Sequence, residues 1–599
     1  MGERLFHKDP TLMNPTLPAP EGDSSATRHF IPPVKIWVTL ASLATATVLV
    51  RYGWLEVLVG DVIDQAVRNI ITLILSFTGC MSLFIWFIRE SDFRPIVKKS
   101  VTAVLGTLII LALAVLRIER VSGDLVPQFA FRWQARNDAL LPSAATLVSR
   151  GNTKKTSSVW NATLDDSPCF LGPQGTASID GIELDTTWDQ KPPRCIWKRP
   201  IGAGWSGFAT YGSHAVTLEQ RGNDEAITCY SIANGEPEWA VSVPARHETV
   251  LGGIGPRSTP TIDDGIVYAT GATGWLHVIE GSTGEVLWRK DIVADLGIDR
   301  VAHAAAVAWG RAGSPLVTEQ LVIVPAGGPR TEFDALKDDT DKTTLDPKRS
   351  RYVSLVAYDR TSGDQKWVAG TEQISYASPQ LIRLGDRNAV VTVNEGHVAA
   401  YEINSGNQLW QSVWPGHSNS DASCSQPHIL ASDRFFISKG YGIGSAVFSL
   451  SQSKSDWTIK PVWQQSNLLK TKFTNVAIHN DYAYGLSDGI LECVELSTGK
   501  RMWKKGRYGQ GQLLRVGATL LIQAESGEVV VVLAPPEKPA ELSRFSALNG
   551  QTWNNLCLSG NKLLVRNAEE AACYEVSVQR KTALLQETAQ QTEKVLSDE

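Results

Sequence analysis

Several short polar segments of the chain carry cationic, amide and aromatic side chains that could bind an anion. The segments are PRSTP (256–260), RAGSP (311–315), YASP (376–379), CSQP (424–427), KTKFTN (470–475), GQGQ (509–512) and TWNN (552–555). If they meet, they bring together Arg257, Arg311, Tyr376, Gln426, Lys472, Asn475, Gln512, Trp553 and Asn555, with Lys439 nearby. Guanidinium and ammonium groups donate charge-assisted hydrogen bonds to carboxylates. The set therefore predicts a site for an anionic ligand.

Neither catalytic residues nor a metal site are predicted. The eight cysteines are scattered, without a CxxC pair or two adjacent cysteines, which predicts neither a zinc site nor a disulfide framework. Cys229 and Cys493 each lie ten residues before a Trp, and we interpret them as small buried hydrophobic residues. Five histidines also lack ligand spacing: His303, His397, His417, His428 and His479. The net charge of -5 and the pI near 6.1 argue against a nucleic-acid partner.

A repeated phrase indicates the architecture that positions the polar segments. In five places a Gly stands four residues before a Trp, as in ELSTGKRMW (495–503). The pairs are Gly235 and Trp239, Gly284 and Trp288, Gly363 and Trp367, Gly406 and Trp410, and Gly499 and Trp503. Alternating apolar residues and Gly-rich turns surround each pair, which predicts half-buried β-strands joined by hairpins. We expect each Gly to form the turn and each Trp ring to pack between neighbouring units.

Counting the units predicts an eight-bladed, all-β propeller over residues 187–579. A degenerate unit ends at Trp463, and two more, at 520–545 and 561–578, lack the Gly-Trp phrase. The last unit ends without an outer strand, whereas PPRCIWKRPIG (192–202) has a Trp but no preceding unit. The early segment is therefore predicted to pair with the last unit and close the ring, which leaves no long free sheet edge.

Within such a ring the polar segments are crossings between blades and surround the axial pocket. The acidic residues Glu219, Glu225 and Glu395 are placed on hairpins farther from the axis, so cations dominate at the mouth. A structural interpretation remains open. Ser-Pro and Thr-Pro can simply shape the bend into an inner strand, and Arg and Lys can pair with neighbouring carboxylates.

The first part of the chain belongs to another class. Three apolar stretches, at 36–50, 69–88 and 101–116, predict three transmembrane helices. The loop at 89–100 carries Arg89, Arg94, Lys98 and Lys99, which predicts that it is cytoplasmic and that the residues after Arg117 lie outside. The predicted domains are a cytoplasmic segment (1–33), a membrane region (34–117), a connector (118–186), the propeller (187–579) and a polar tail (580–599). Residues 142–168 are interpreted as linker, and 337–350 as a solvated insertion.

The Gly-Trp units resemble the PQQ-like, quinoprotein-type family of eight-bladed propellers. That family includes quinoprotein alcohol dehydrogenases and the propeller lipoprotein of the outer-membrane barrel-assembly machine. Stretches such as PIGAGWSGFA (200–209) and GLSDGILECVEL (485–496) also resemble membrane-anchored PQQ-repeat proteins of planctomycete-type bacteria. For a dehydrogenase the resemblance implies a vicinal disulfide and a calcium site of Glu, Asn and Asp. This sequence has no adjacent cysteines, no matching calcium set and no lipobox Cys.

We therefore expect a binding or scaffold module tethered to the bacterial cytoplasmic membrane, with its propeller in the periplasm. Its expected partners are the lipid bilayer and an envelope protein, peptide or glycan. The alternative is a membrane-bound dehydrogenase that uses PQQ with calcium to oxidise an alcohol or sugar.

Overall fold

The computed structural model describes residues 30–52, 54, 64–151, 160–333, 346–384, 387–431, 433–453 and 456–580. The predicted tail after Arg580, most of the N-terminal segment and residues 337–345 of the insertion lie outside the described residues. The chain divides into two compact units, one of residues 1–49 and 72–110 and one of residues 50–71 and 111–599.

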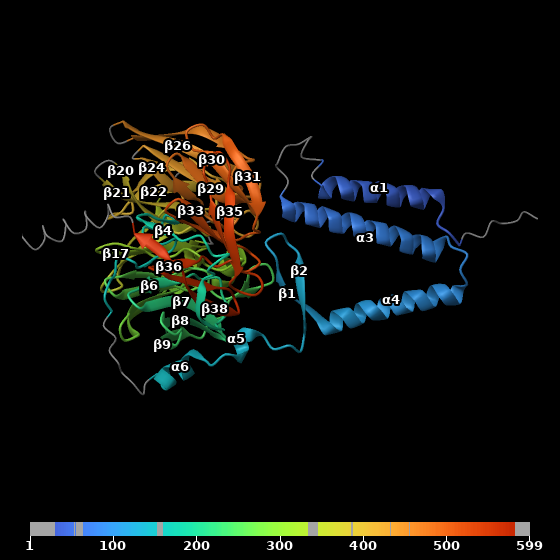
Figure 1. The fold of residues 1–599 in the computed structure, drawn as a ribbon, viewed down its shortest axis with the longest axis horizontal. Helices are drawn as coiled ribbons and strands as arrows, with labels where there is room; N and C mark the ends of the chain where they lie inside the picture. Colours follow the sequence, from blue (N-terminus) through green and yellow to red (C-terminus); the bar gives the residue numbers. More distant parts are fainter. Residues whose placement is uncertain are drawn as a thin grey trace, which may run out of the picture. The chain divides into compact units, whose positions relative to one another are not determined.

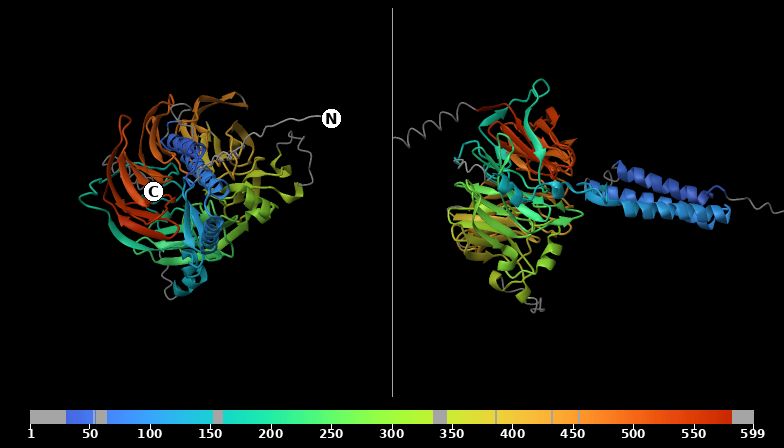
Figure 2. Two further views of the ribbon diagram at one scale, coloured as in Figure 1. Left: turned by 90° about the vertical axis from the view of Figure 1, so that its right-hand side faces the viewer. Right: turned by 90° about the horizontal axis from the view of Figure 1, so that it is seen from below.

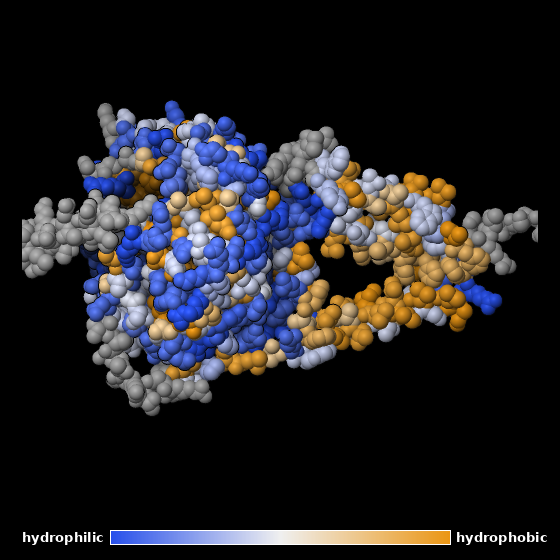
Figure 3. All heavy atoms as spheres, in the orientation of Figure 1, coloured by the Kyte–Doolittle hydropathy of each residue, from blue (hydrophilic) through white to orange (hydrophobic). Residues whose placement is uncertain are grey.

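Three helices match the predicted membrane spans. They are α1 (Val34–Arg51), α3 (Gln65–Arg89) and α4 (Pro95–Val115), and all three are long and apolar enough to cross a bilayer. Hydrophobic side chains cover most of their visible surface (Figure 3). Leu40 and Leu43 of α1 lie beside Gly79 of α3, and Lys35 forms an ion pair with Glu90 at 2.8 Å.

Eight antiparallel sheets follow one another around a ring, as predicted (Figures 1 and 2). The first four blades are β6 (Ala209–Tyr211), β7 (His214–Arg221), β8 (Asp224–Ser231) and β9 (Pro237–Val243); β12 (Thr261–Asp263), β13 (Ile266–Thr270), β14 (Trp275–Glu280) and β15 (Glu285–Asp291); β16 (Leu316–Val317), β17 (Leu321–Gly327), β18 (Val353–Asp359) and β19 (Gln365–Ala369); and β20 (Gln380–Leu384), β21 (Arg387–Val393), β22 (His397–Glu402) and β23 (Gln408–Val413).

The fifth to eighth blades complete the ring. They are β24 (His428–Ala431), β25 (Arg434–Lys439), β26 (Gly444–Ser453) and β27 (Asp456–Gln465); β28 (Ala477–His479), β29 (Tyr482–Ser487), β30 (Ile490–Glu495) and β31 (Arg501–Arg507); β32 (Gln512–Val516), β33 (Thr519–Gln523), β34 (Glu528–Leu533) and β35 (Ala540–Ser546); and β36 (Cys557–Ser559), β37 (Lys562–Arg566), β38 (Glu570–Glu575) and β5 (Arg194–Pro200). Buried aliphatic side chains pack between facing blades and form the core.

The early strand closes the ring. β5 pairs antiparallel with β38, with Trp197 opposite Cys573. Ion pairs between Lys198 and Glu570 at 2.9 Å and between Arg194 and Glu575 at 2.8 Å flank this ladder. The last blade therefore contains strands from both ends of the propeller, which leaves no unpaired edge at the seam.

Each Gly of the repeated phrase lies against a Trp of the preceding blade. The five glycines have φ between 70° and 74°, which favours Gly in the turn. A Cβ on Gly235, Gly284, Gly363, Gly406 or Gly499 would lie within 2.9 Å of the ring of Trp197, Trp239, Trp288, Trp367 or Trp463. The indole N–H of each of these tryptophans donates to a backbone carbonyl of the following blade. The phrase thus forms a repeated joint between blades.

The connector runs partly through the ring, which the sequence did not predict. Ser167 exchanges hydrogen bonds with Thr210 of the first blade and donates to Leu558 O of the last blade. Farther along, β3 (Ser178–Ile179) pairs in parallel with β32, on the inner edge of the seventh blade. The segment from Ser167 to β3 therefore lies against inner strands of the ring. Only residues 167–168 of this segment belong to the predicted linker, part of which lies outside the described residues.

Shorter elements surround the ring. They are the hairpin of β1 (Leu116–Val121) and β2 (Pro127–Phe131), the pair β4 (Ile182–Leu184) and β39 (Val578–Arg580), the pair β10 (Glu248–Thr249) and β11 (Gly253–Ile254), the helices α5 (Asn137–Leu140), α6 (Ala144–Gly151), α7 (Ile292–Asp295) and α8 (Arg300–Ala306), and the 3-10 turns η1 (Thr331–Phe333) and η2 (Pro347–Arg349).

Candidate functional site

A chamber of about 310 Å³ lies among the crossings between blades. Aromatic rings dominate its wall: Phe170, Trp205, Trp309, Tyr376, Tyr441, Phe473 and Trp553. The ring of Trp553 lies 4.7 Å from that of Trp205 and 4.9 Å from that of Phe473, measured between centroids. Since these residues come from different blades, the chamber exists only when the ring is closed.

The structure brings most of the predicted ligand residues into this wall. Those that line the chamber are Arg257, Tyr376, Lys472, Asn475, Gln512, Trp553 and Asn555. Their polar atoms are held in place by bonds between crossings. Asn475 Oδ1 accepts from Gln426 N at 2.8 Å, and Gln512 Nε2 donates to Phe473 O and Trp553 O.

The other three predicted residues lie outside the wall. Arg311 is buried and donates to the carbonyls of Pro325 and Ala326 in β17, so it supports the bend into the third blade. Gln426 is buried and bonds through its backbone N–H. Lys439 donates to Pro415 O at 2.7 Å and lies 3.6 Å from Asp421, and burial lowers the pKa of its ammonium group. Arg311 and Lys439 therefore bond to neighbouring groups of the chain outside the chamber wall.

Arg257 is the cation of the wall that is best suited to bind an anionic ligand. Its guanidinium donates to the backbone carbonyls of Gly252 and Gly255, and none of the described carboxylates forms an ion pair with it. Burial lowers the pKa of Arg257 to about 10, so the group is still charged near neutral pH. The side chain of Arg257 is half-buried, and an anion in the chamber would offset the cost of desolvating a cation that has no counterion.

Lys472 has carboxylate partners already. Its Nζ lies 3.0 Å from Asp488 Oδ1 and 3.9 Å from Asp64 Oδ2, and Lys470 lies 3.6 Å from Asp64. Gln65 N donates to Asp488 Oδ2 at 2.8 Å, which attaches the first residue of α3 to this cluster.

The two carboxyl groups of this cluster respond differently to burial. Burial raises the pKa of Asp64, and the charge of Lys472 only partly opposes it. At Asp488 the same burial is outweighed by Lys472 and by the Gln65 N–H, so the pKa of Asp488 is lowered. Lys472 is therefore mainly an ion-pair residue whose side chain also borders the chamber.

The β1–β2 hairpin covers part of the chamber. Ser122, Gly123 and Leu125, at its turn, line the wall together with Ala66. Gly123 N donates to Glu525 Oε1 at 2.9 Å, and Gln551 Nε2 donates to Val121 O at 3.1 Å. Sequence reasoning missed this docking, because the contacts join residues some 400 positions apart and follow no local pattern.

The predicted acidic residues also have defined places. Glu219 is buried and accepts from Arg221, Thr228 and Tyr230. Glu225 is buried in the β7–β8 hairpin, accepts from Ala272 N at 2.8 Å, and has a pKa raised by burial to about 7. Neither lines the chamber, and the charged residues among its described wall residues are the cations Arg257 and Lys472.

The wall does not suit a calcium-bound quinone. Calcium prefers several oxygen ligands, with carboxylates prominent among them. No described residue that lines the chamber is Asp or Glu, and the carboxylate of Glu525 accepts from the indole N–H of Trp553 at 3.0 Å. Cys424 is the one cysteine among the described wall residues, and burial raises the pKa of its thiol to about 12.

Comparisons with known proteins agree with the fold. Residues 197–505 match the family model described as outer membrane protein assembly factor BamB. A protein of that name from Yersinia pestis is 22% identical over 327 residues, which cover 54% of this chain and 70% of the relative.

Two solved structures are also similar to this chain. The crystal structure of BamB from Moraxella catarrhalis has a TM-score of 0.44 and 14% identity, and covers 64% of this chain and 99% of its own. The quinohemoprotein alcohol dehydrogenase from Comamonas testosteroni has a TM-score of 0.47 and 10% identity, and covers 73% of this chain and 83% of its own. At these TM-scores the likeness carries no argument about function.

Proposed function

Because the chain belongs to the family described as outer membrane protein assembly factor BamB, we propose that it is a binding and scaffold module of the bacterial envelope. Fold and family alone do not determine a role, so the proposal depends on a site that can bind a ligand. The observation that carries it is Arg257, which lines an aromatic chamber and lacks an ion-pair partner among the described residues.

The proposed location is the bacterial cytoplasmic membrane, crossed by α1, α3 and α4. Basic residues flank the short loop between α3 and α4. Among them are Arg89 at the end of α3 and Lys98 near the start of α4. Under the positive-inside rule this loop is cytoplasmic. Three crossings then place the propeller on the periplasmic side.

The proposed ligand is an acidic group of an envelope protein, peptide or glycan. A carboxylate could pair with Arg257, which shares the chamber wall with the aromatic rings. The rings would cover an apolar neighbour of that carboxylate, as in other concave sites with few polar groups. Leu251, which is 48% exposed, also lines the chamber and is a residue that a larger partner could touch.

A site-specific photocrosslinker tests this. A benzoylphenylalanine at Leu251 should give a discrete adduct in native membranes, and Arg257→Gln should reduce its yield at least several-fold. The matched control is the same probe at Leu287, which is 51% exposed on β15 but does not line the chamber. Equal adducts at both positions, or an adduct insensitive to Arg257→Gln, would count against the chamber as the binding site.

The alternative function is a PQQ-dependent dehydrogenase that oxidises an alcohol or sugar. The cation Arg257 favours an anionic quinone, whereas the lack of a carboxylate among the described wall residues opposes calcium. Titration of the detergent-solubilised chain with PQQ and calcium separates the two functions. A saturable absorbance change together with dye reduction would establish the enzyme; no binding at micromolar PQQ would remove it.

A further inference from the structure

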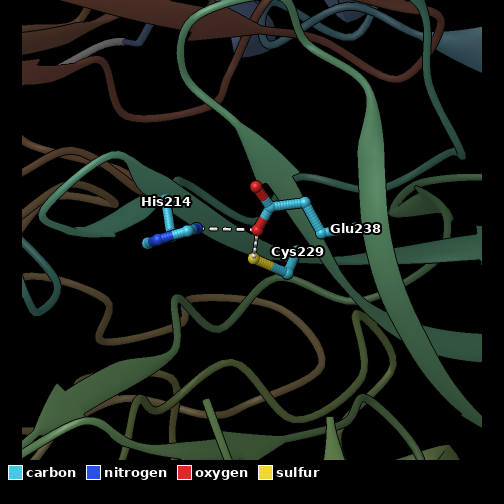
Figure 4. A group of neighbouring side chains, drawn as sticks. All are labelled: His214, Cys229 and Glu238. Carbon is cyan, nitrogen blue, oxygen red and sulfur yellow. Dashed lines mark hydrogen bonds and ion pairs between the residues drawn. The ribbon is translucent and has the colours of Figure 1, made fainter. Parts of the chain in front are cut away.

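Three potential metal ligands converge on the first blade, outside the wall of the chamber. His214 lies on β7, Cys229 on β8 and Glu238 on β9, and their side chains point toward one another (Figure 4). His214 Nδ1 lies 2.7 Å from Glu238 Oε2, and Cys229 Sγ donates to the same oxygen at 3.4 Å. All three ligand atoms lie within 4.8 Å of one another.

The blade itself explains why these side chains meet. Cys229 is opposite Val216 on one side and Trp239 on the other, so His214, two residues before Val216, shares its face of the sheet. A β-bulge follows, because Tyr230 is opposite Pro237 and leaves Glu238 unpaired. Bulges redirect a side chain, and this one brings the Glu238 carboxylate to the face that carries His214 and Cys229.

Every blade has these three positions, but only the first carries three ligands. The position of Cys229 is taken by Val278, Ala357, Ala400, Val447, Cys493, Val531 and Cys573. The bulge position of Glu238 is taken by Leu287, Lys366, Leu409, Val462, Met502, Leu542 and Ile196. The position of His214 is taken by Ile266, Leu321, Ala389, Arg434, Tyr482, Thr519 and Lys562.

The fold therefore does not require a thiol, an imidazole and a carboxylate at these places. The sixth and eighth blades also have a Cys in the central position, yet neither combines it with His and Glu. Cys229 alone would be explained as a small buried residue, as the sequence suggested. The additional imidazole and carboxylate, aimed at the same point, call for another explanation.

The surroundings hold the imidazole in a ligating orientation. The His214 ring stacks on Trp160 with centroids 4.9 Å apart, and Nε2 lies 3.2 Å from Ser213 Oγ. With its proton on Nε2 directed at Ser213, the ring would present a lone pair at Nδ1, as ligating histidines do. His214 and Cys229 are buried, whereas the side chain of Glu238 is 28% exposed and leaves a path for an ion.

We propose that His214, Cys229 and Glu238 form a Zn²⁺ site that clamps three strands of the first blade, with water as the fourth ligand. Nitrogen, sulfur and carboxylate donors together suit zinc, with bonds of about 2.0–2.3 Å. On binding, the thiol proton passes to solvent and the S–H···O bond to Glu238 is replaced by a Zn–S bond. Tetrahedral ligands would lie roughly 3.3–3.7 Å apart at those bond lengths. The Cys229 Sγ–Glu238 Oε2 distance of 3.4 Å already fits, whereas His214 Nδ1 and Glu238 Oε2, now 2.7 Å apart, must separate on binding.

Cobalt substitution tests the site with the whole chain in detergent. After chelation, Co²⁺ should bind with one equivalent and give a thiolate-to-cobalt charge-transfer band and the intense visible bands of tetrahedral Co²⁺. Zn²⁺ should then remove both signals. Zn²⁺ should also raise the Tm of the chelated protein, because a ligand that binds only the folded state stabilises it.

The neighbouring blades supply the matched variants. Cys229→Val introduces the residue type that stands at this position in the second blade, and it should abolish the charge-transfer band and the Tm rise. Cys493→Val makes the same change in the sixth blade and should preserve both. Glu238→Leu, which copies the bulge residue Leu287 of the second blade, should weaken Co²⁺ binding at least tenfold and serves if Cys229→Val does not fold. No band in the native chain, or a band that survives Cys229→Val or Glu238→Leu, would overturn the proposal.

Discussion

Gly363 and Gly265 have nearly the same backbone conformation, with φ of 74° and 72°, but different surroundings. A Cβ on Gly363 would lie 2.8 Å from the ring of Trp288, whereas a Cβ on Gly265 would meet nothing within 4 Å. Both substitutions to Ala strain the left-handed backbone by about 1–2 kcal/mol. Only the first also displaces a Trp of the neighbouring blade.

We therefore expect Gly363→Ala to destabilise the propeller by about 1–3 kcal/mol more than Gly265→Ala. The free energy of unfolding in urea, measured on the detergent-solubilised chain, gives the difference. Equal costs for the two variants would mean that the Gly-Trp contact is not a close joint between blades.

Glu225 makes stability depend on pH. Its pKa is about 7 in the folded chain, against an ordinary value of 4.5, because burial disfavours the carboxylate. Between these values the folded state keeps a proton that the unfolded state has lost. The stabilisation from this group is therefore fully present below about pH 4.5. Between about pH 4.5 and about pH 7 the free energy of unfolding falls by at most about 3 kcal/mol, and above about pH 7 the stabilisation is lost.

Glu225→Gln should remove this dependence, because a neutral amide oxygen can still accept from Ala272 N. Relative to the native chain, the variant should gain stability as the pH rises from about 5 to about 8. Urea unfolding at several pH values checks the sign. A variant that loses stability over that window would show that Glu225 is ionised in the folded protein.

Among the elements, the closing strand β5 has the clearest test. The ring of Trp197 packs on Gly235 of the first blade, and its N–H donates to Ile232 O at 2.8 Å. Trp197→Ala should cost about 3 kcal/mol, because loss of the ring leaves a gap at the seam. Trp197→Phe should cost less, since most of the ring contact remains.

Hydrogen exchange provides the second readout for the seam. In the native chain the β5 amides that face β38, its ladder partner, should exchange as slowly as the β38 amides that face β5. In Trp197→Ala both strands should exchange faster than the strands of the fourth blade, on the other side of the ring. Fast exchange of the β5 amides that face β38 in the native chain would contradict a closed propeller.

The ion cluster at the start of α3 should show strong coupling. Lys472→Met leaves Asp488 and Asp64 buried without that cation and should cost about 3–5 kcal/mol. Combining it with Asp488→Asn should restore part of this loss, with a coupling energy of about 1–3 kcal/mol. Additive costs in the double-mutant cycle would show that the Lys472–Asp488 contact is not maintained in solution.

Elements also show what could be predicted from the sequence. The blades and membrane helices follow from local periodicity, and the seam follows from one Trp segment without a unit and one unit without an outer strand. The axial course of Ser167 to Ser178 could not be predicted, because a polar segment has the same composition whether its partners are water or inner strands.

For the predicted pocket, the sequence likewise does not show where each side chain points. Arg257 and Arg311 occupy equivalent crossings, yet one lines the chamber and the other points into β17. Spacing identifies the crossing but not the rotamer. Trp205 and Tyr441 were missed because they lie outside the segments that the crossings define, and the His214–Cys229–Glu238 cluster depends on a bulge that sequence does not reveal.

At the scale of the whole molecule, the chain combines three apolar helices with a closed ring that belongs to the BamB family. If the helices tether the ring outside the cytoplasm, partners in the envelope can reach the chamber. If the ring were cytoplasmic, the proposed envelope role would be wrong although the fold would be unchanged. Sidedness is therefore the property on which the proposed function most depends.

The most direct measurement is labelling of spheroplasts with a membrane-impermeant maleimide. Cys195 is an exposed native thiol on β5, and it should react in intact spheroplasts. The labelling should be absent in Cys195→Ser. In a Cys195→Ser background, Arg94→Cys in the loop after α3 should react only after the membrane is disrupted. The reverse pattern, with Arg94→Cys labelled from outside and Cys195 protected, would contradict a periplasmic propeller.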